Sequence, residues 1–383
     1  MINRFILNET SYHGKGSREK LAFEIKSRGF KKCLVVTDKT LLECGVSKKV
    51  TDILDQNQID YVVFSDVKPN PTVKNVQDGL KVCRDNNIDV IVAVGGGSAI
   101  DTAKAIGITC TNPEFEDVVS LEGVADTKNK SLPIIALPTT SGTAAEVTIN
   151  YVITDEKTKT KMVCVDPHDI PLVAIVDSEL MMSMPTKLAA ATGMDALTHA
   201  VEGYITKGAW ELSDMFHLSA IKLIFKYLPD AVNKKDETAI EQMALAQYVA
   251  GMGFSNVGLG IVHSMAHQLG AIYDTPHGIA NAILLPYVMK YNGEVCSNKF
   301  RNILEALDVD TKDMDDSKVI ARFVKMISDL SREVGITDGI RDVGAKETDL
   351  EMLAAKALKD PCTPGNPKEP TLEDIINIYK EAM

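Results

Sequence analysis

The chain has 383 residues, of which 45% are hydrophobic and 25% charged, a balance that excludes a long disordered or low-complexity chain. Its 41 Lys and Arg residues are outnumbered by 53 Asp and Glu residues, so the formal net charge is −12 at pH 7. Binding to nucleic acid or to an anionic membrane surface needs clustered positive charge. We therefore expect neither nucleic acid nor membrane as a partner.

No stretch of the sequence approaches the ~18 consecutive apolar residues of a membrane-spanning helix. The N-terminus, MINRFILNET, mixes Asn, Arg and Glu among its apolar residues, so it lacks the core of a signal peptide. The seven cysteines are odd in number and include no CxxC pair, which is typical of unpaired thiols in a reducing compartment. These features predict a cytoplasmic protein.

The first half alternates short runs rich in Val and Ile with amphipathic segments such as Val73–Asn86 and Ala99–Ile108. Near-continuous apolar runs of this length are typical of strands buried on both faces of a parallel sheet. The predicted strands are Cys33–Thr37, Tyr61–Phe64, Val90–Val94, Pro133–Leu137 and Leu172–Val176. Their order predicts a doubly wound, Rossmann-like α/β sheet. Residues 150–166, NYVITDEKTKTKMVCVD, predict a β-hairpin with a polar turn.

From Lys187 onward the strand-like runs largely vanish and long helical patterns follow. The predicted helices are Ala189–Thr206, Leu212–Leu228, Ile240–Gly251, Asn298–Leu307, Lys318–Val334 and Leu372–Tyr379. We therefore predict two domains, an α/β domain of residues 1–184 and an all-α domain of residues 185–383.

Three glycines, Gly95–Gly97, stand between a predicted strand and a helical segment. Without side chains they let a phosphate approach the backbone, and the N-terminus of the next helix offers N–H groups to a pyrophosphate. Ser98 is placed to cap that helix, with Asp101 in its first turn. Because Ile100 replaces the third glycine of a GxGxxG fingerprint, a simple tight turn is the alternative interpretation.

A second loop, LPTTSGTAAEVT at 137–148, also follows a predicted strand and is rich in hydroxyl groups. Hydroxyl and backbone N–H groups at the carboxyl end of a strand suit a ligand that lies across an open sheet. An ordinary polar loop that caps a helix is the alternative.

Asp38 follows the predicted strand Cys33–Thr37. An acidic residue there can accept hydrogen bonds from a ribose and repel a 2′-phosphate, which favours NAD over NADP. Because the sequence DKTLLE can open a helix, a role as helix N-cap is the alternative.

Two pairs of potential metal ligands stand four residues apart, Asp195 with His199 and His263 with His267, so each pair lies on one face of a predicted helix. His277 follows in the turn YDTPHG. One carboxylate and several imidazoles from separate segments indicate a site for a divalent transition metal. No Glu follows the first His of HSMAH, so this is not the HExxH motif of metalloproteases. Core or surface histidines are the alternative for each pair taken alone.

Four long segments together resemble the iron-containing alcohol dehydrogenase family: GGGSAIDTAK, PTTSGTAAEVT, ATGMDALTHAVEGY and GIVHSMAHQLGAIYDTPHGIANAILLP. The resemblance extends to CTPGNPKEPTLEDI at 362–375 and covers essentially the whole chain. It implies a dinucleotide-binding α/β domain, a helical metal-binding domain, an active site in the cleft between them, and a homodimer associated with the N-terminal strand. Three further segments, VCVDPHDIP, GYITKGAW and QYVAGMGFSNVGLG, are most similar to the members that interconvert lactaldehyde and propane-1,2-diol.

The resemblance also implies roles for individual residues. The metal, Fe²⁺ with Zn²⁺ as the alternative, would be bound by Asp195, His199, His263 and His277, and His267 would line the nicotinamide and substrate site. Contacts with NAD(H) would fall on Asp38, Asn70, Gly96, Gly97, Ser98, Asp101, Thr139, Thr140, Thr143 and Lys161. The substrate pocket would be bordered by Asn150, Phe254, Leu259 and Cys362. Gln268 and Pro364 depart from the family pattern close to that pocket and bear on the preferred substrate.

Together these features predict a metal-dependent, NAD(H)-linked alcohol dehydrogenase that acts on a small alcohol or aldehyde, with His267 relaying a proton. Propane-1,3-diol, glycerol, ethylene glycol and butanol are alternative substrates. A lyase of the dehydroquinate synthase type, which uses NAD transiently, and a non-catalytic nucleotide-binding protein are the alternative functions.

Overall fold

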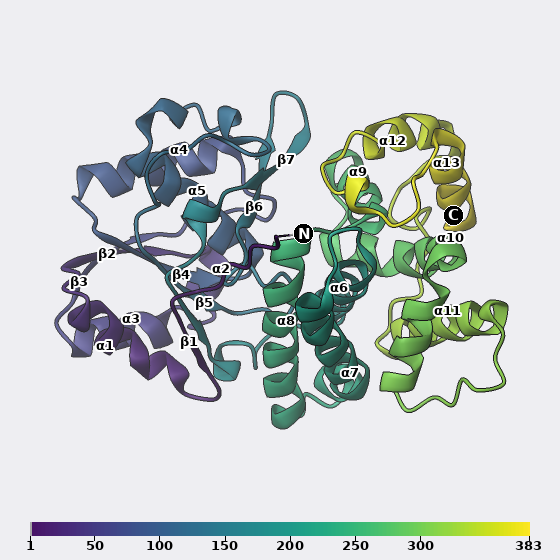
Figure 1. The fold of residues 1–383 in the computed structure, drawn as a ribbon. Helices are drawn as coiled ribbons and strands as arrows, with labels where there is room; N and C mark the ends of the chain where they lie inside the picture. The colour runs from purple at the N-terminus through teal and green to yellow at the C-terminus, as the bar shows by residue number, and fades with distance from the viewer. Residues whose placement is uncertain (1) are drawn as a thin grey trace. The chain divides into compact units, whose positions relative to one another are not determined.

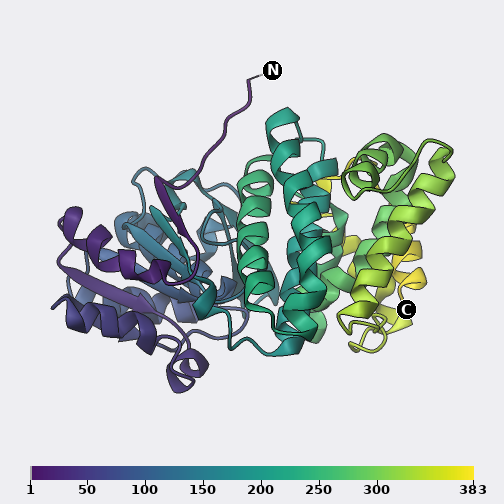
Figure 2. The ribbon, with the colours of Figure 1, turned by 90° about the horizontal axis from the view of Figure 1, so that it is seen from below.

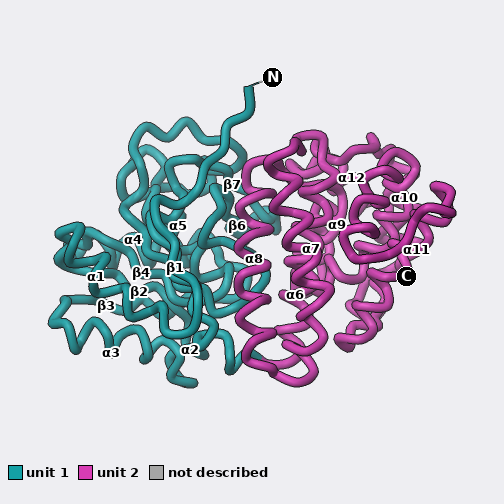
Figure 3. Tube along the Cα trace, turned by 60° about the horizontal axis from the view of Figure 1, so that its bottom comes forward, with its two compact units in different colours: residues 1–184 teal, residues 185–383 magenta. Residues whose placement is uncertain are grey.

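The computed structural model describes residues 2–383 and divides into two compact units, one ending at Met184 and one spanning Pro185–Met383 (Figure 3). Unit 1 contains all the strands together with short helices, and unit 2 is helical throughout (Figure 1). This confirms the predicted fold class, an α/β unit followed by an all-α unit.

Six parallel strands form the sheet of unit 1, in the spatial order β3-β2-β4-β5-β8-β1. The strands are β1 (Thr10–His13), β2 (Lys32–Val36), β3 (Asp60–Phe64), β4 (Val90–Gly95), β5 (Ile134–Pro138) and β8 (Val173–Val176). The five runs predicted as strands are confirmed to within one residue at each end. The short strand β1 completes the sheet by pairing in parallel with β8 at one edge.

If β1 is set aside and the other five strands are numbered along the chain, their order across the sheet is 2-1-3-4-5. The direction of winding therefore reverses between β2 and β4. In open α/β sheets, ligands bind beyond the carboxyl ends of the strands at such a reversal. Asp38 follows β2 and Gly96 follows β4, so both stand at this switch point.

Helices cover both faces of the sheet, and the alternation of side chains along each strand supplies a core on each face. The helices of unit 1 are α1 (Leu21–Ser27), α2 (Lys39–Glu43), α3 (Lys48–Gln56), α4 (Val73–Asp85) and α5 (Gly97–Thr111). In β4, Ile91 and Ala93 join the core beneath α4 and α5. Val90 and Val92 join the opposite core, with α1 and α3. This two-sided burial explains why the strands read as continuous apolar runs.

The predicted hairpin is confirmed as β6 (Asn150–Asp155) and β7 (Thr160–Val165), which pair antiparallel. It lies against α5, where the backbone N–H of Val152 donates to Oδ2 of Asp101 at 3.0 Å. Asp101 therefore ties the hairpin to the helix that follows the glycine-rich turn.

Unit 2 contains eight α-helices, and to within one residue each predicted helix lies inside one of them. They are α6 (Thr186–Ile205), α7 (Glu211–Asn233), α8 (Glu237–Val257), α9 (Ile261–Tyr273), α10 (His277–Ala306), α11 (Asp316–Glu333), α12 (Leu350–Ala357) and α13 (Leu372–Glu381). The predicted segment Asn298–Leu307 is only the end of α10, which begins at His277.

The helices α6, α7 and α8 pack side by side (Figure 2). Two glycines make room for the buried ring of His217 on α7, because a Cβ atom at Gly203 or Gly253 would lie 2.4 or 2.2 Å from its Nε2 atom. This close packing anchors α6, which carries two of the predicted metal ligands.

Within the described part of the chain, no helix taken alone has the length and apolarity of a membrane span. Only α8 and α9, considered together across a bend of 102°, meet that criterion.

Candidate active site

The glycine-rich turn leads directly into α5. Gly96 is the N-cap residue and α5 begins at Gly97, so the prediction that Ser98 caps this helix is wrong. The extended backbone of Gly96 starts the helix before Ser98, which therefore lies inside the first turn. The N-cap and the first residue of α5 are thus both glycines, so no side chain at these two positions obstructs a phosphate at the helix N-terminus.

The two predicted loops of unit 1 touch each other at the carboxyl edge of the sheet. The backbone N–H of Thr139 donates to the carbonyl of Gly95 at 3.0 Å. A Cβ atom at Gly96 would lie 3.2 Å from the Thr140 side chain, and one at Gly97 would lie 2.8 Å from that of Thr143. A side chain at Gly97 would collide with Thr143, and one at Gly96 would crowd Thr140. This follows because the loop after β5, residues 139–143 and here called the threonine loop, packs directly on the turn.

Three other predicted nucleotide contacts lie in unit 1. Oδ1 of Asp38 accepts a hydrogen bond from the backbone N–H of Leu41 at 2.9 Å, so the N-cap interpretation of Asp38 is observed. Lys161 on β7 donates from Nζ to Oδ1 of Asn70 at 2.9 Å, which brings two predicted contacts together. Whether these residues bind a nucleotide stays a prediction.

The four predicted metal ligands converge in unit 2. One ligand atom from each of Asp195, His199, His263 and His277 lies within 4.8 Å of the others, and the first three side chains are buried. Asp195 and His199 come from α6, and His263 comes from α9. His277 is the first residue of α10, not part of a turn as predicted, because the preceding turn ends at Pro276. Oxygen and imidazole donors in this number suit a divalent transition metal.

The electrostatics of the cluster favour neutral imidazoles. Burial lowers the pKa of His263 to about 4, so its ring is uncharged at neutral pH and keeps a lone pair for a cation. Its Nδ1 atom lies 2.6 Å from Oε2 of Glu202. The Nε2 atom is therefore the one that lies toward the other ligands.

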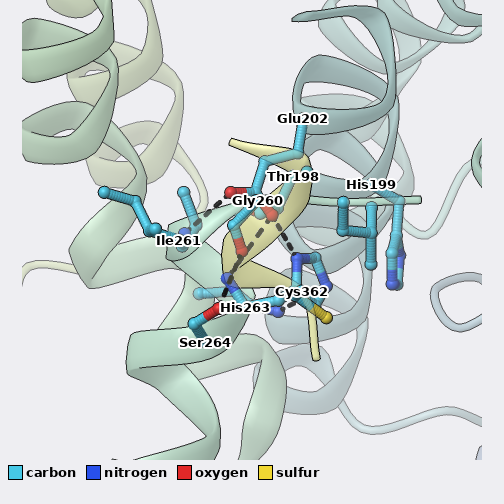
Figure 4. A network of polar contacts seen from close by, with 12 residues as sticks. Thr198, His199, Glu202, Gly260, Ile261, His263, Ser264 and Cys362 are labelled. Atoms are coloured by element: carbon cyan, nitrogen blue, oxygen red, sulfur yellow. Dashed lines mark hydrogen bonds and ion pairs between the residues drawn. The ribbon is translucent and has the colours of Figure 1, made fainter. Parts of the chain in front are cut away.

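Glu202 is a residue of the site that the sequence did not reveal. It lies on α6, three residues after His199, with its carboxylate between the first turn of α9 and the His263 ring (Figure 4). Oε1 accepts from the backbone N–H of Val262 at 2.7 Å. Burial raises the pKa of Glu202 to about 7, although the backbone N–H donors oppose this rise. The shared helical face of Asp195, His199 and Glu202 is the signal that could have indicated it.

Asn281 is the second unpredicted residue, on α10 one turn after His277. Its Nδ2 atom donates to Oδ1 of Asp195 at 2.7 Å and lies 3.3 Å from Nε2 of His263 and 3.2 Å from Nε2 of His277. Among the described residues its buried Oδ1 atom has no hydrogen-bond partner. The amide N–H side of Asn281 thus faces Asp195 and the rings of His263 and His277. The four clustered side chains themselves, one carboxylate and three imidazoles, are the donor set that fits a cation.

His267 lies beside this cluster but is not one of its four members. Its ring stacks on that of His277 with centroids 5.4 Å apart, and its Nδ1 atom lies 2.8 Å from Oδ2 of Asp360. Burial acts to raise the pKa of Asp360, but the charge and hydrogen bond of His267 outweigh it and lower the pKa. Because an ionised carboxylate only accepts, Nδ1 of His267 carries the hydrogen and Nε2 is left for other partners.

Two of the four predicted pocket residues lie beside the cluster or beside its neighbour His267. The Phe254 ring stacks on His199 with centroids 4.2 Å apart, and Leu259 is buried just before α9. Cys362 groups with His267 and Asp360, and burial raises the pKa of its thiol well above its ordinary value. Asn150 lies in unit 1, where its carbonyl accepts from Nζ of Lys104 at 2.9 Å. The pocket itself stays a prediction.

Family patterns match nearly the whole chain. The pattern for iron-containing alcohol dehydrogenases matches residues 8–178, and that for the C-terminal part of the Fe-containing alcohol dehydrogenase family matches residues 189–383. The chain belongs to the iron-containing alcohol dehydrogenase family, so the resemblance seen in the sequence is confirmed and the protein is an oxidoreductase.

Individual relatives cover the chain completely. It is 54% identical over 382 residues to the lactaldehyde reductase of Escherichia coli (strain K12), covering 100% of both chains. It is 39% identical to the NAD-dependent methanol dehydrogenase of Bacillus methanolicus, again over 100% of both chains. The crystal structure of a 1,3-propanediol oxidoreductase matches with a TM-score of 0.97 at 40% identity and covers 100% of both chains.

The position of Glu202 predicts that its carboxylate sets the metal affinity of His263. In Glu202→Gln, the side chain keeps nearly the volume of glutamate but has only one oxygen. The glutamate uses both of its oxygens, one for the backbone N–H of Val262 and one for Nδ1 of His263. We expect the affinity for Zn²⁺, measured by competition with a chromogenic chelator, to fall roughly 10–100-fold. Glu211→Gln, at an exposed position at the start of α7, is the matched control and should bind as the parent does. Unchanged affinity in Glu202→Gln would show that the carboxylate serves only to pack α9.

Proposed function

We propose that the protein is a metal-dependent, NAD(H)-linked alcohol dehydrogenase that interconverts lactaldehyde and propane-1,2-diol. The observation that carries this proposal is the buried cluster of Asp195, His199, His263 and His277. The lactaldehyde reductase at 54% identity supports the choice of substrate, and the NAD-dependent methanol dehydrogenase supports the choice of cofactor.

Within unit 2, the four clustered residues would hold one divalent cation, Fe²⁺ or Zn²⁺. The set contains one carboxylate and three imidazoles but no thiolate, and both ions accept such ligands. Because Zn²⁺ generally binds nitrogen and oxygen sites more tightly than Fe²⁺, occupancy by iron would reflect metal supply. Asn281 would hold Asp195 in place through its hydrogen bond to Oδ1.

Within unit 1, the turn after β4 and the threonine loop after β5 would hold the pyrophosphate of NAD. Their backbones meet at the carboxyl ends of β4 and β5, and β4 borders the reversal of strand order, where dinucleotides bind in this architecture. The proposed contacts are Asp38, Asn70, Gly96, Gly97, Ser98, Thr139, Thr140, Thr143 and Lys161. Asp101 joins them, although its carboxylate already accepts the N–H of Val152.

In the proposed reaction, NAD(H) supplies the hydride carrier and the divalent cation supplies Lewis acidity toward the alcohol or aldehyde oxygen. His267 would move the proton, because its Nδ1–H is held by Asp360 and its Nε2 atom is left to exchange one with the substrate side. Asp360 would keep that ring in one tautomer and one orientation. Glu202 would do the same for His263.

The substrate would be small, and Phe254, Leu259 and Cys362 of unit 2 would border it. Asn150 of unit 1 stays a predicted pocket residue. Gln268, one of the two departures from the family pattern, donates from Nε2 to the carbonyl of Ser264 at 3.1 Å. Its amide is thus engaged within α9, so this departure does not itself argue against a small diol.

We also infer a cytoplasmic homodimer. The edge of β1 opposite β8 pairs with no strand among residues 2–383, and such an edge offers backbone groups to a second copy. The scattered free cysteines support a reducing compartment. Sedimentation equilibrium and cell fractionation measure these two properties directly.

An anaerobic screen tests the substrate assignment. With Fe²⁺ or Zn²⁺ added to metal-free protein, we expect NADH-linked reduction of lactaldehyde with a kcat/KM about tenfold or more above that for butanal, which has no hydroxyl group beside its carbonyl. Glycolaldehyde and 3-hydroxypropanal are the closest competitors to compare. A lyase that regenerates its cofactor would give no net NADH change with any of these aldehydes. Preference for 3-hydroxypropanal would keep the reaction class and overturn the substrate.

Asp38 tests the choice of NAD over NADP, and its role as a helix cap can be separated from its charge. Asp38→Asn keeps a side-chain oxygen for the N–H of Leu41 but removes the charge, whereas Asp38→Gly removes both. If charge repels a 2′-phosphate, both variants should raise the NADPH-to-NADH ratio of kcat/KM roughly tenfold. A ratio that stays at the parent value in both would leave Asp38 as a helix cap only.

His263 and His267 test the division of roles within α9. His263→Ala should lose both bound metal and activity, since it removes a ligand. His267→Ala should keep its metal content, measured by elemental analysis, while kcat falls roughly 10²–10⁴-fold through loss of the proton route. Equal loss of metal in the two variants would mean that His267 is itself a ligand.

A further inference from the structure

Two thiols outside the proposed site meet between α4 and α5 in unit 1. Sγ of Cys83 on α4 lies 3.8 Å from Sγ of Cys110 on α5, and neither is in a disulfide. One helical turn earlier on each helix, Gly79 lies against Ile106, with a Cβ position only 2.3 Å from Cδ1 of that isoleucine. The missing side chain at Gly79 lets the helices approach and brings the two thiols together.

The two thiols differ in exposure and surroundings. Cys83 is 1% exposed, whereas Cys110 is only partly buried near the end of α5. The hydrogen bond from the Cys83 thiol and the positive charge of Arg84 lower the pKa of Cys110. The same hydrogen bond and burial raise the pKa of Cys83. Cys110 is therefore the thiol that an oxidant reaches first and in its more reactive form.

We propose that Cys83 and Cys110 form a redox-active dithiol, which a hydroperoxide converts into a disulfide that links α4 to α5. The Cys110 thiolate attacks the terminal peroxide oxygen, the O–O bond breaks, and the leaving alkoxide or hydroxide takes up a proton. Cys83 then attacks the Cys110 sulfenic sulfur, an S–S bond replaces the S–O bond, and water leaves with the Cys83 proton. Two thiols lose two electrons and two protons, and the hydroperoxide is reduced to an alcohol or water.

The link would act on stability and not on the proposed chemistry. Cys110 stands near the last residue of α5 and the glycine-rich turn precedes its first, a separation of roughly 20 Å at 1.5 Å per residue. The disulfide would join residues 27 positions apart and restrict the unfolded chain. It would therefore hold together the two helices that cover one face of the sheet.

The test exposes the full-length, zinc-loaded protein to a small excess of hydrogen peroxide, since zinc has no redox chemistry of its own. We expect the intact mass to fall by two hydrogens and a non-reducing peptide map to show Cys83 joined to Cys110. The thermal midpoint should rise by roughly 5–10 °C and return to its starting value with dithiothreitol. These readouts do not depend on the proposed enzymatic activity.

Single variants separate the two roles. Cys83→Ser should stop at a Cys110 sulfenic acid that dimedone traps, and Cys110→Ser should form no disulfide. Cys44→Ser removes an exposed thiol elsewhere in unit 1 and should behave as the parent. A parent protein that gains oxygen without losing two hydrogens would overturn the proposal. A disulfide that joins any other pair, or one that persists in Cys83→Ser, would also overturn it.

Discussion

The site in unit 2 depends on one buried hydrogen bond, that between Oε2 of Glu202 and Nδ1 of His263. A carboxylate removed from water is costly unless it is paired, and Glu202 is paired with backbone N–H groups of the first turn of α9 as well as with the imidazole. One side chain of α6 thus fixes where α9 begins and which nitrogen of His263 lies toward the cluster. Gly260 permits this approach, because a Cβ atom there would lie 2.8 Å from Oε1 of Glu202.

The same arrangement recurs one turn further along α9. Asp360 contacts Nδ1 of His267 as Glu202 contacts Nδ1 of His263, so Nε2 of each ring is the nitrogen left for other partners. The two histidines share a helix and a face but have different neighbours. His263 lies beside Asn281 and His277. His267 lies beside Cys362, and its ring stacks on that of His277. This difference in surroundings, and not their spacing, is the physical basis for assigning them different roles.

The parts of the molecule that follow from local pattern could be predicted from the sequence. The strand Val90–Val94 reads as an apolar run because both of its faces are covered, and the spacing of Asp195 and His199 places them on one face of α6. Tertiary partners could not be predicted in the same way. From sequence alone, a glutamate within a helix is expected to be exposed to solvent, and only the packing of α9 shows that Glu202 is buried. Asn281 belongs to no spacing pattern of metal ligands. The prediction that Ser98 caps α5 is wrong because Gly96, with no side chain, is the N-cap and the helix begins at Gly97.

We propose that one carboxylate and three imidazoles of unit 2 bind a single divalent metal. X-ray absorption spectroscopy of the protein loaded with Zn²⁺ or Fe²⁺ measures the identity of the bound atoms directly. We expect a shell of nitrogen and oxygen neighbours with the multiple scattering of about three imidazoles, and no sulfur. A sulfur neighbour at about 2.3 Å would place Cys362 on the metal, and a spectrum without imidazole scattering would remove the histidines from it. Either result would contradict this set of four ligands.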